Sequence, residues 1–363
     1  MRYLTMLLLS CLYVCVFSCH AKVADSAVQY RKYTINSDNS ETLIQVLTLD
    51  PKRVKIVAVR AHETGDSIAT VGIIAKHFNA LAAINGGFFR LNETDNNWVA
   101  AGALKIDNQW HGIAYQSRGA IGWSPVTNTL LFDRLQTDSK IIVGNNTLPI
   151  NVMNKIVTGN KTALLSDSFT DSVKFNNSTG ITILDHRVQA VYNNHDTMTI
   201  PPDAYLYYLS GTTPNNIKAF KVGEPAIIDI KVRPQLNKQS ANQWNKLPYI
   251  VGGGPLLIHK GKKITNFNVE NLDKKFLYNR DARTAVGILP DGRWVFVVVT
   301  GSLLPNTAGF TILELRDFMS SLGCTAALNL DGGGSSAMYL RDATDLVVVE
   351  RPVADAILVL AKN

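Results

Sequence analysis

Short runs of alternating apolar and polar residues constrain the fold of this chain more than any other feature. Leu43 to Leu49 and Val54 to Val59 are the first two runs, with a turn at Asp50-Pro51 between them. This period of two residues predicts β-strands, because successive side chains of a strand point to opposite faces. Residues 100–235 continue the pattern, with Asn, Asp, Pro and Gly between the runs.

Helical spacing of apolar residues is clear in only two segments. The first is expected over Ile68 to Phe78, with Ser67 as its N-cap. The second is expected to begin at a capping box formed by Thr311 and Glu314 and to end at Gly323. A structural role is therefore expected for the Glu314 carboxylate.

A single domain is expected over residues 25–363. The length of 363 residues allows one large domain or two small ones, but no linker-like stretch divides the chain after its first residues. A content of 46% hydrophobic and 18% charged residues excludes a disordered protein. The segments Thr284 to Ile288 and Trp294 to Thr300 predict a hairpin around Pro290-Asp291-Gly292. The sequence thus predicts an α+β fold: a single domain with a mixed β-sheet, many short strands and few helices.

The amino terminus predicts export. Arg2 precedes the apolar run Tyr3 to Phe17, which is too short to span a bilayer and is typical of a secretory signal peptide over residues 1–19. Val16-Phe17-Ser18-Cys19 resembles a bacterial lipobox, in which Cys19 would carry the lipid anchor, and ordinary cleavage near Cys19-His20-Ala21 is the alternative. We expect a periplasmic, envelope-tethered or secreted protein without a transmembrane helix in its mature chain.

The net charge limits the kinds of ligand that the protein is expected to bind, and the cysteine content limits its disulfides. The formal net charge is +7, and no Lys/Arg run with interleaved aromatic residues suggests binding to nucleic acid. A modest basic excess suits an anionic ligand better. After the signal peptide Cys324 is the only cysteine, so no internal disulfide is expected and this thiol is predicted to lie in the core.

Three glycine-rich turns adjoin short apolar strands. They are Asn85-Gly86-Gly87, Gly252-Gly253-Gly254-Pro255 and Asp331-Gly332-Gly333-Gly334-Ser335-Ser336. Glycines let backbone N–H groups approach an anion closely, and the two serines add hydroxyl donors. The first and third turns resemble one another, which predicts that they lie on opposite sides of one cleft; a coincidence of common residues is the alternative.

Asp331 is the main candidate for chemistry, because it follows a buried strand and precedes three glycines. The turn lacks the Gly-Lys-Ser/Thr of a P-loop and the final glycine of a nucleophile elbow, so an anion-binding or acid–base site is predicted. A tight turn whose aspartate caps its own backbone is the alternative. Arg283, which opens a strand, is suited to clamping a phosphate, unless it forms a salt bridge with Asp281 or Asp331.

No metal site or other cofactor is expected. The histidines show no ligand spacing, and the sequence contains no His-Glu-x-x-His motif. Calcium or magnesium held by loop oxygens is left open.

Three ordered blocks, residues 83–90, 282–287 and 328–335, resemble the phosphodiester glycosidase family. Residues 252–258, 313–315 and 351–355 are also similar to it, so that the likeness runs from residue 81 to residue 363, although residues 125–245 do not match closely. The resemblance implies a hydrolase that splits a sugar from a phosphodiester. The further carboxylates in the matched blocks are Glu314, Asp281 and Asp355.

The resemblance also implies roles for the candidate residues. Asp331 would act as nucleophile or as base on water, Arg283 would hold the phosphate, and Asn85 would orient oxygens of the substrate. The substrate-binding residues would be Gly86, Gly87, Gly253, Gly254, Gly332, Gly333, Gly334, Ser335 and Ser336. The expected partner is a sugar phosphodiester, either a small molecule or a glycopolymer. The alternatives are a non-catalytic carbohydrate- or phosphate-binding envelope protein and a divalent-metal phosphodiesterase.

Overall fold

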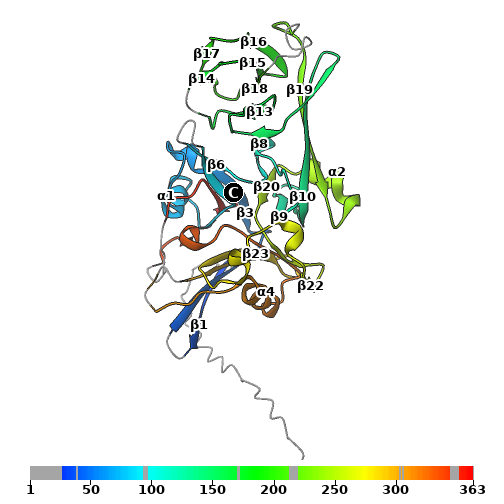
Figure 1. Cartoon of the computed structure of the whole chain (residues 1–363). Helices are drawn as coiled ribbons and strands as arrows, with labels where there is room; N and C mark the ends of the chain where they lie inside the picture. The colour runs from blue at the N-terminus through cyan, green and yellow to red at the C-terminus, as the bar shows by residue number, and fades with distance from the viewer. Residues whose placement is uncertain are drawn as a thin grey trace, which may run out of the picture.

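The computed structural model describes residues 27–37, 40–92, 97–169, 172–211, 220–301, 304, 306–343 and 351–362. The predicted signal peptide and both cleavage sites at Cys19 lie outside these residues. Within the described residues there are 27 strands and four α-helices, and the strands form several sheets (Figure 1). The predicted α+β fold with many short strands and few helices is confirmed. No helix in these ranges is long and apolar enough to cross a membrane.

One sheet of seven strands carries helix α4 on one face. Its order is β1 (Val28–Ser37), β2 (Ser40–Leu49), β24 (Trp294–Val299), β23 (Arg283–Ile288), β25 (Ala326–Asn329), β21 (Leu256–His259) and β22 (Lys262–Lys263). The predicted hairpin is confirmed as β23 paired with β24. Helix α4 (Ile312–Ser321) begins at the predicted capping box, since Thr311 accepts from the Glu314 N–H and Glu314 accepts from the Thr311 N–H. Cys324 is buried beneath this helix, and burial raises the pKa of its thiol to about 12.

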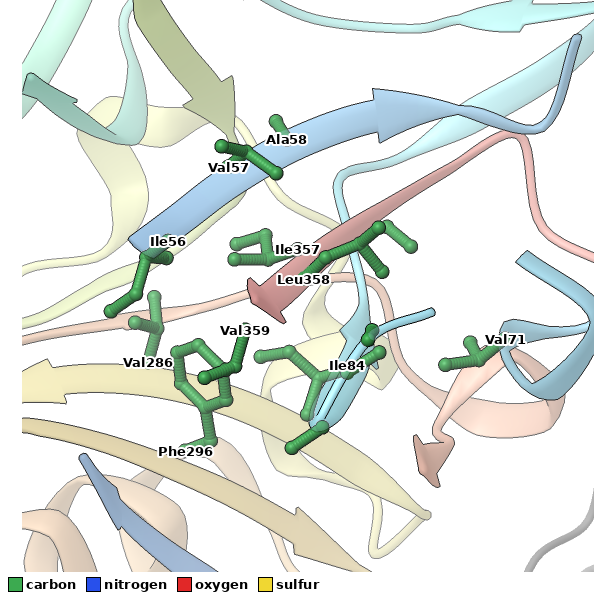
Figure 2. Packing of buried hydrophobic residues seen from close by; sticks show 14 of the residues in the cluster. Ile56, Val57, Ala58, Val71, Ile84, Val286, Phe296, Ile357, Leu358 and Val359 are labelled. Atoms are coloured by element: carbon green, nitrogen blue, oxygen red, sulfur yellow. The ribbon is translucent and has the colours of Figure 1, made fainter. Parts of the chain in front are cut away.

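A sheet of four strands packs against the seven-stranded sheet. Its order is β26 (Met338–Leu340), β4 (Ala82–Asn85), β27 (Asp355–Ala361) and β3 (Val54–Arg60). Figure 2 shows Ile84 and Val359 of the four-stranded sheet beside Val286 and Phe296 of the seven-stranded one, and all four side chains are buried. This shared core fixes the ends of β4, β25 and β27 relative to one another.

Helix α1 (Val71–His77) is shorter than the sequence predicts, and Ser67 is not its N-cap. Ala69 forms a backbone bridge with Val353, which keeps the residues before the helix extended. Thr70 caps the helix instead, because its side chain accepts from the N–H of Ile73.

The middle of the chain forms a third and a fourth sheet. The third contains β11 (Asn146–Pro149), β10 (Thr129–Val143), β9 (Arg118–Ser124), β20 (Tyr249–Gly252), β7 (Leu104–Ile106), β8 (Gln109–Gly112) and β19 (Ala226–Pro234). The fourth contains β12 (Val152–Met153), β13 (Thr162–Leu165), β18 (Tyr205–Ser210), β15 (Ser178–Leu184) and β16 (Arg187–Tyr192). The long strands β10 and β19 run toward this fourth sheet, which lies farthest from α4 (Figure 1).

The remaining elements are short. They are β5 (Phe89–Asn92) paired with β6 (Asn97–Ala100), β14 (Val173–Lys174) paired with β17 (Thr197–Met198), α2 (Ala241–Asn245), α3 (Lys274–Tyr278) and the 3₁₀ turns η1 (Ala61–Thr64), η2 (Lys238–Ser240), η3 (Asn268–Glu270) and η4 (Gly333–Ser335).

Candidate active site

The first and third glycine turns lie side by side, although 246 residues separate them. The side-chain Nδ2 of Asn85, at the end of β4, donates to the carbonyl of Asp331 at 2.9 Å. In return the N–H of Asp331 donates to the carbonyl of Gly86 at 3.2 Å. The two turns are therefore bonded directly to each other, and the prediction that they lie on opposite sides of one cleft is wrong.

The second glycine turn joins the same group. The N–H of Gly253 donates to the carbonyl of Gly119 at 2.8 Å, and the N–H of Gly254 donates to that of Asn329 at 2.8 Å. A Cβ on Gly253 would lie 2.4 Å from the carbonyl oxygen of Asn329. Because a side chain at this position would collide with the backbone at the end of β25, the turn depends on glycine.

Two carboxylates lie at these turns: Asp331 belongs to the third turn, and Asp355 is bonded to the first. Asp355, the first residue of β27, is buried, and its Oδ1 accepts from the N–H of Gly87 at 2.9 Å. A Cβ on Gly86 would lie 1.8 Å from that same Oδ1, so the first turn must be glycine for Asp355 to reach it. Asp331 is partly open, with 16% of its side chain exposed.

The pKa values of both carboxyl groups are raised. Burial, with a smaller contribution from the charge of Asp331, raises the pKa of Asp355 to about 7. Burial also raises the pKa of Asp331, while hydrogen bonds from Ser335 and Gly332 and the charge of Arg351 oppose the rise. The charge of Asp331 therefore favours the protonated form of the Asp355 carboxyl group.

Arg351 is a cation beside Asp331. Its side chain is 55% exposed, its Nη2 lies 3.6 Å from Oδ2 of Asp331, and it also donates to Oγ of Ser335. The guanidinium carbon lies 5.4 Å from the centre of the Phe89 ring. A guanidinium held in this way keeps donors free for an anionic ligand beside Asp331.

The third turn is shaped by its three glycines. The N–H of Gly332 donates to Oδ1 of Asp331 at 2.9 Å. Gly333 opens η4 with a φ of +56°, which favours glycine. The carbonyl of Gly334 accepts from the backbone N–H of Arg351 at 3.2 Å, so the turn also positions that arginine.

The side chain of Arg283 lies beside Gly332 and is buried, with only 1% exposed. Its Nε donates to the carbonyl of Phe310, and its Nη2 donates to those of Phe276 and Asn279. Within the described residues it forms no salt bridge with Asp281 or Asp331, so the alternative raised from the sequence is not found. Its neighbourhood is that of a residue that holds the loop before β23; a direct role in the reaction stays a prediction.

Asn85 is also turned inward. Its Oδ1 accepts from Oγ1 of Thr284 at 2.7 Å and from the N–H of Ala337 at 3.2 Å, while its Nδ2 bonds Asp331. These contacts make Asn85 a positioning residue for the turn that carries Asp331. Its predicted direct contact with substrate oxygens remains a prediction.

The two serines of the third turn differ. Ser335 is buried, and its Oγ contacts Arg351. The Oγ of Ser336 is buried and has no hydrogen-bond partner among the described residues.

The other two carboxylates of the matched blocks form interactions with nearby residues. Glu314 pairs with Arg280, and Asp281 accepts a hydrogen bond from the N–H of Ala282.

Arg351 and Asp355 were not among the site residues predicted from the sequence, although both lie in a block that resembles the family. The sequence signal that could have identified them is an arginine four residues before an aspartate that opens an apolar strand.

In the described part of the chain, no group of three or more His, Cys, Asp or Glu residues is arranged to hold a metal ion.

The chain was compared with known families and structures. Residues 183–360 match the sequence model of the phosphodiester glycosidase family, a range that includes Asp331, Arg351 and Asp355 and begins after the first glycine turn. No protein of curated function matches the chain.

Two bacterial crystal structures share the fold. A hypothetical protein from Synechocystis has 24% identity and a TM-score of 0.75, over 93% of this chain and 62% of that one, so this chain spans less than two thirds of it. A Burkholderia pseudomallei protein, whose name suggests export, has 19% identity and a TM-score of 0.72, over 88% of this chain and 74% of that one.

The catalytic domain of zebrafish N-acetylglucosamine-1-phosphodiester alpha-N-acetylglucosaminidase has 12% identity and a TM-score of 0.49, over 96% of this chain and 88% of that one. The resemblance inferred from the sequence is confirmed by the family match, in which residues 183–360 are similar to the phosphodiester glycosidases.

Proposed function

We propose that this protein hydrolyses the glycosidic bond of a sugar-1-phosphodiester and releases the free sugar and a phosphomonoester. The observation that carries this proposal is the pair Asp331 and Asp355 on adjoining turns, with the exposed guanidinium of Arg351 next to Asp331. The name of the matched family supports the reaction type.

The reaction needs charge stabilisation more than acid catalysis. Water oxygen becomes bonded to the anomeric carbon, the bond from that carbon to the phosphate oxygen breaks, and the phosphate keeps the electron pair. Because the leaving group is already a stabilised anion, little protonation of the leaving oxygen is required. Arg351 would bind this phosphate through its guanidinium.

Asp331 would supply the carboxylate that an oxocarbenium-like transition state requires. It attacks the anomeric carbon in a retaining mechanism, or it activates the water in an inverting one. Asp355 would keep its proton below pH 7, so that the pair carries one negative charge, on the more exposed Asp331. The configuration of the sugar first released, observed by NMR, distinguishes the two mechanisms.

The test uses a panel of hexose 1-phosphate methyl diesters, including that of N-acetylglucosamine, hydrolysed in ¹⁸O-labelled water. The proposal expects label in the sugar and none in the phosphate. Label in the phosphate would indicate P–O cleavage and a phosphodiesterase, and binding without turnover would indicate a carbohydrate- or phosphate-binding protein. We propose that no cofactor is needed, so activity should survive EDTA.

We also propose that the protein is exported. Arg2 and the apolar run up to Phe17 support export, and the name of the Burkholderia relative points the same way. The mass of the mature protein, and its labelling or not with a palmitate analogue in a bacterial host, would distinguish ordinary cleavage from lipidation at Cys19. Recovery of the uncleaved chain in the cytoplasm would contradict export.

A further inference from the structure

A pocket of about 150 Å³ adjoins the candidate active site. Its lining includes Phe88, Gly252 and Gly253 at the glycine turns and Tyr115, Gln116 and Arg118 from the segment that leads into β9. Gly252 is the residue whose carbonyl lies 2.4 Å from where a Cβ on Gly87 would be. The pocket therefore shares its wall with the turn whose Gly87 N–H holds Asp355.

Arg118 has a hydrogen-bond donor that nothing in the described structure uses. Its Nη2 donates to the carbonyl of Asn271 at 3.3 Å, but its Nε is buried without any partner. Among the described residues no carboxylate lies within 4.0 Å of this guanidinium. A buried, unpaired guanidinium donor is costly unless a ligand or water satisfies it.

The carboxylate that interacts electrostatically with Arg118, that of Glu270, accepts its hydrogen bonds from other groups. Glu270 acts on Arg118 electrostatically, yet its Oε1 accepts from Nε of Arg134 at 2.8 Å and from the N–H of Leu256 at 3.0 Å. Its Oε2 accepts from the N–H of Gly119 at 2.8 Å. None of these hydrogen bonds joins Glu270 to Arg118, so the Nε donor of Arg118 stays without a partner in the described structure and can serve another anion.

The rest of the wall is held in place. The Tyr115 hydroxyl accepts from the N–H of Met153 at 2.9 Å, and the side chain of Gln116 accepts from Nδ2 of Asn271 at 3.3 Å. The other lining residues are mostly small, among them Ala101, Gly102, Ala103, Ala114 and Ala120. The pocket is thus a small cavity with one cationic side chain.

We propose that this pocket binds a second anionic group of the substrate, a carboxylate or a further phosphate, through Arg118. The inference rests on the proposed function for the identity of the substrate and deepens it, because it separates the anion held at the reaction centre from a second anion that selects the substrate. The expected substrates are therefore phosphodiesters with at least two acidic groups, such as repeats of a charged glycopolymer.

The test compares three diesters of N-acetylglucosamine 1-phosphate: the methyl ester, the 2-carboxyethyl ester and the 2-phosphoethyl ester. Wild-type protein is expected to prefer at least one charged ester over the methyl ester by about tenfold to a hundredfold in kcat/KM, the range of a charge-assisted hydrogen bond. Whichever charged ester is preferred distinguishes a carboxylate from a phosphate. Arg118→Gln should reduce the preference to near unity while changing hydrolysis of the methyl ester less than about threefold.

The matched control is Arg187→Gln, because Arg187 is an exposed arginine that likewise donates to one backbone carbonyl, that of Gly223. It should retain the full preference for the charged ester. The inference would be overturned if Arg118→Gln lowered kcat/KM equally for the charged and the methyl esters. It would also be overturned if the wild type hydrolysed the charged and the methyl esters with equal kcat/KM.

A binding measurement tests the pocket independently of whether the protein hydrolyses the esters. The non-hydrolysable phosphonate analogues of the same three compounds are titrated into wild-type and Arg118→Gln proteins by calorimetry. Tighter binding of a charged analogue that Arg118→Gln abolishes supports the pocket even if no ester is hydrolysed. Equal affinity of all three analogues for the wild type would overturn it, whether or not hydrolysis occurs.

Discussion

The backbone N–H of Gly87 donates a hydrogen bond of 2.9 Å to Oδ1 of Asp355. This bond joins residues 268 positions apart, and it brings the carboxylate that opens β27 to the turn that follows β4. The same turn is bonded to Asp331, so one glycine turn positions both carboxylates of the candidate active site.

Gly86→Ala should disrupt this arrangement. The added Cβ would lie 1.8 Å from Oδ1 and 3.1 Å from the backbone oxygen of Asp355, a buried residue, so the strand or the carboxylate would have to shift. We expect kcat/KM to fall by at least about a hundredfold and Tm to fall by several degrees. Gly102→Ala is the control for stability, because a Cβ there meets nothing within 4 Å, and its Tm in differential scanning fluorimetry should match the wild type. An unchanged Tm for Gly86→Ala would contradict this account.

Asp331→Asn should abolish turnover and leave the fold intact. The amide oxygen can still accept from the N–H of Gly332, but the nucleophile or base is lost, so kcat should drop on the order of a thousandfold or more. Sugar release from the preferred methyl diester measures the loss, and circular dichroism checks the fold. Asp291→Asn, in an exposed hairpin, is the matched control and should keep full activity. Substantial activity in Asp331→Asn would remove this residue from the mechanism.

The pH profile should depend on the carboxyl pair. At low pH kcat/KM should fall as Asp331 becomes protonated, and this limb should lie above the ordinary aspartate range, because burial raises its pKa. Above about pH 7 Asp355 ionises, and the second negative charge repels the phosphodiester, so kcat/KM should decline again. At pH 9 about one hundredth of the maximum should remain, if Asp355 must be protonated.

Asp355→Asn tests the second limb directly. The amide stays neutral at every pH, so kcat/KM should stay flat from pH 7 to pH 9 while the low-pH limb persists. Initial rates between pH 4 and pH 9 check both profiles. A decline above pH 7 that survives in Asp355→Asn would show that another group is responsible.

Arg351→Gln should weaken the transition state through loss of the phosphate contact. A neutral amide cannot replace a charge-assisted, forked contact, so kcat/KM should fall about thirtyfold to a hundredfold, and Arg351→Lys should recover only part of it. Arg293→Gln removes an exposed arginine of the β23–β24 hairpin and should have no effect. If Arg283→Gln folds normally and loses as much activity as Arg351→Gln, the assignment of the phosphate to Arg351 alone would be wrong.

Glu270→Gln should destabilise the protein rather than alter its chemistry. The Glu270 carboxylate is fully buried and joins Arg134 to the N–H groups of Gly119 and Leu256. Removing its charge leaves Arg134 without its buried counter-ion, a change that costs about 3–5 kcal/mol of unfolding free energy. Asp317→Asn breaks an exposed pair with Lys263 and should cost less than about 1 kcal/mol. Urea denaturation measures the unfolding free energy of both variants. Equal losses of unfolding free energy in the two variants would contradict this prediction.

Much of the local structure could be predicted from the sequence. The periodicity predicts the hairpin of β23 and β24, and the capping box predicts the start of α4, because both depend on residues close together in the chain. Ser67 failed as an N-cap because the pairing of Ala69 with Val353 is a contact between distant segments.

The sequence alone predicts that three strands adjoin glycine turns and that one turn carries Asp331, and it shows a resemblance to the phosphodiester glycosidases. Which side chains these turns bring together became clear from the three-dimensional packing. Arg283 and Arg351 are equally basic in the sequence, yet one is buried on backbone carbonyls and the other faces Asp331. The direction of a side chain at a strand end depends on how neighbouring sheets pack, and that packing is set by buried residues far away in the chain.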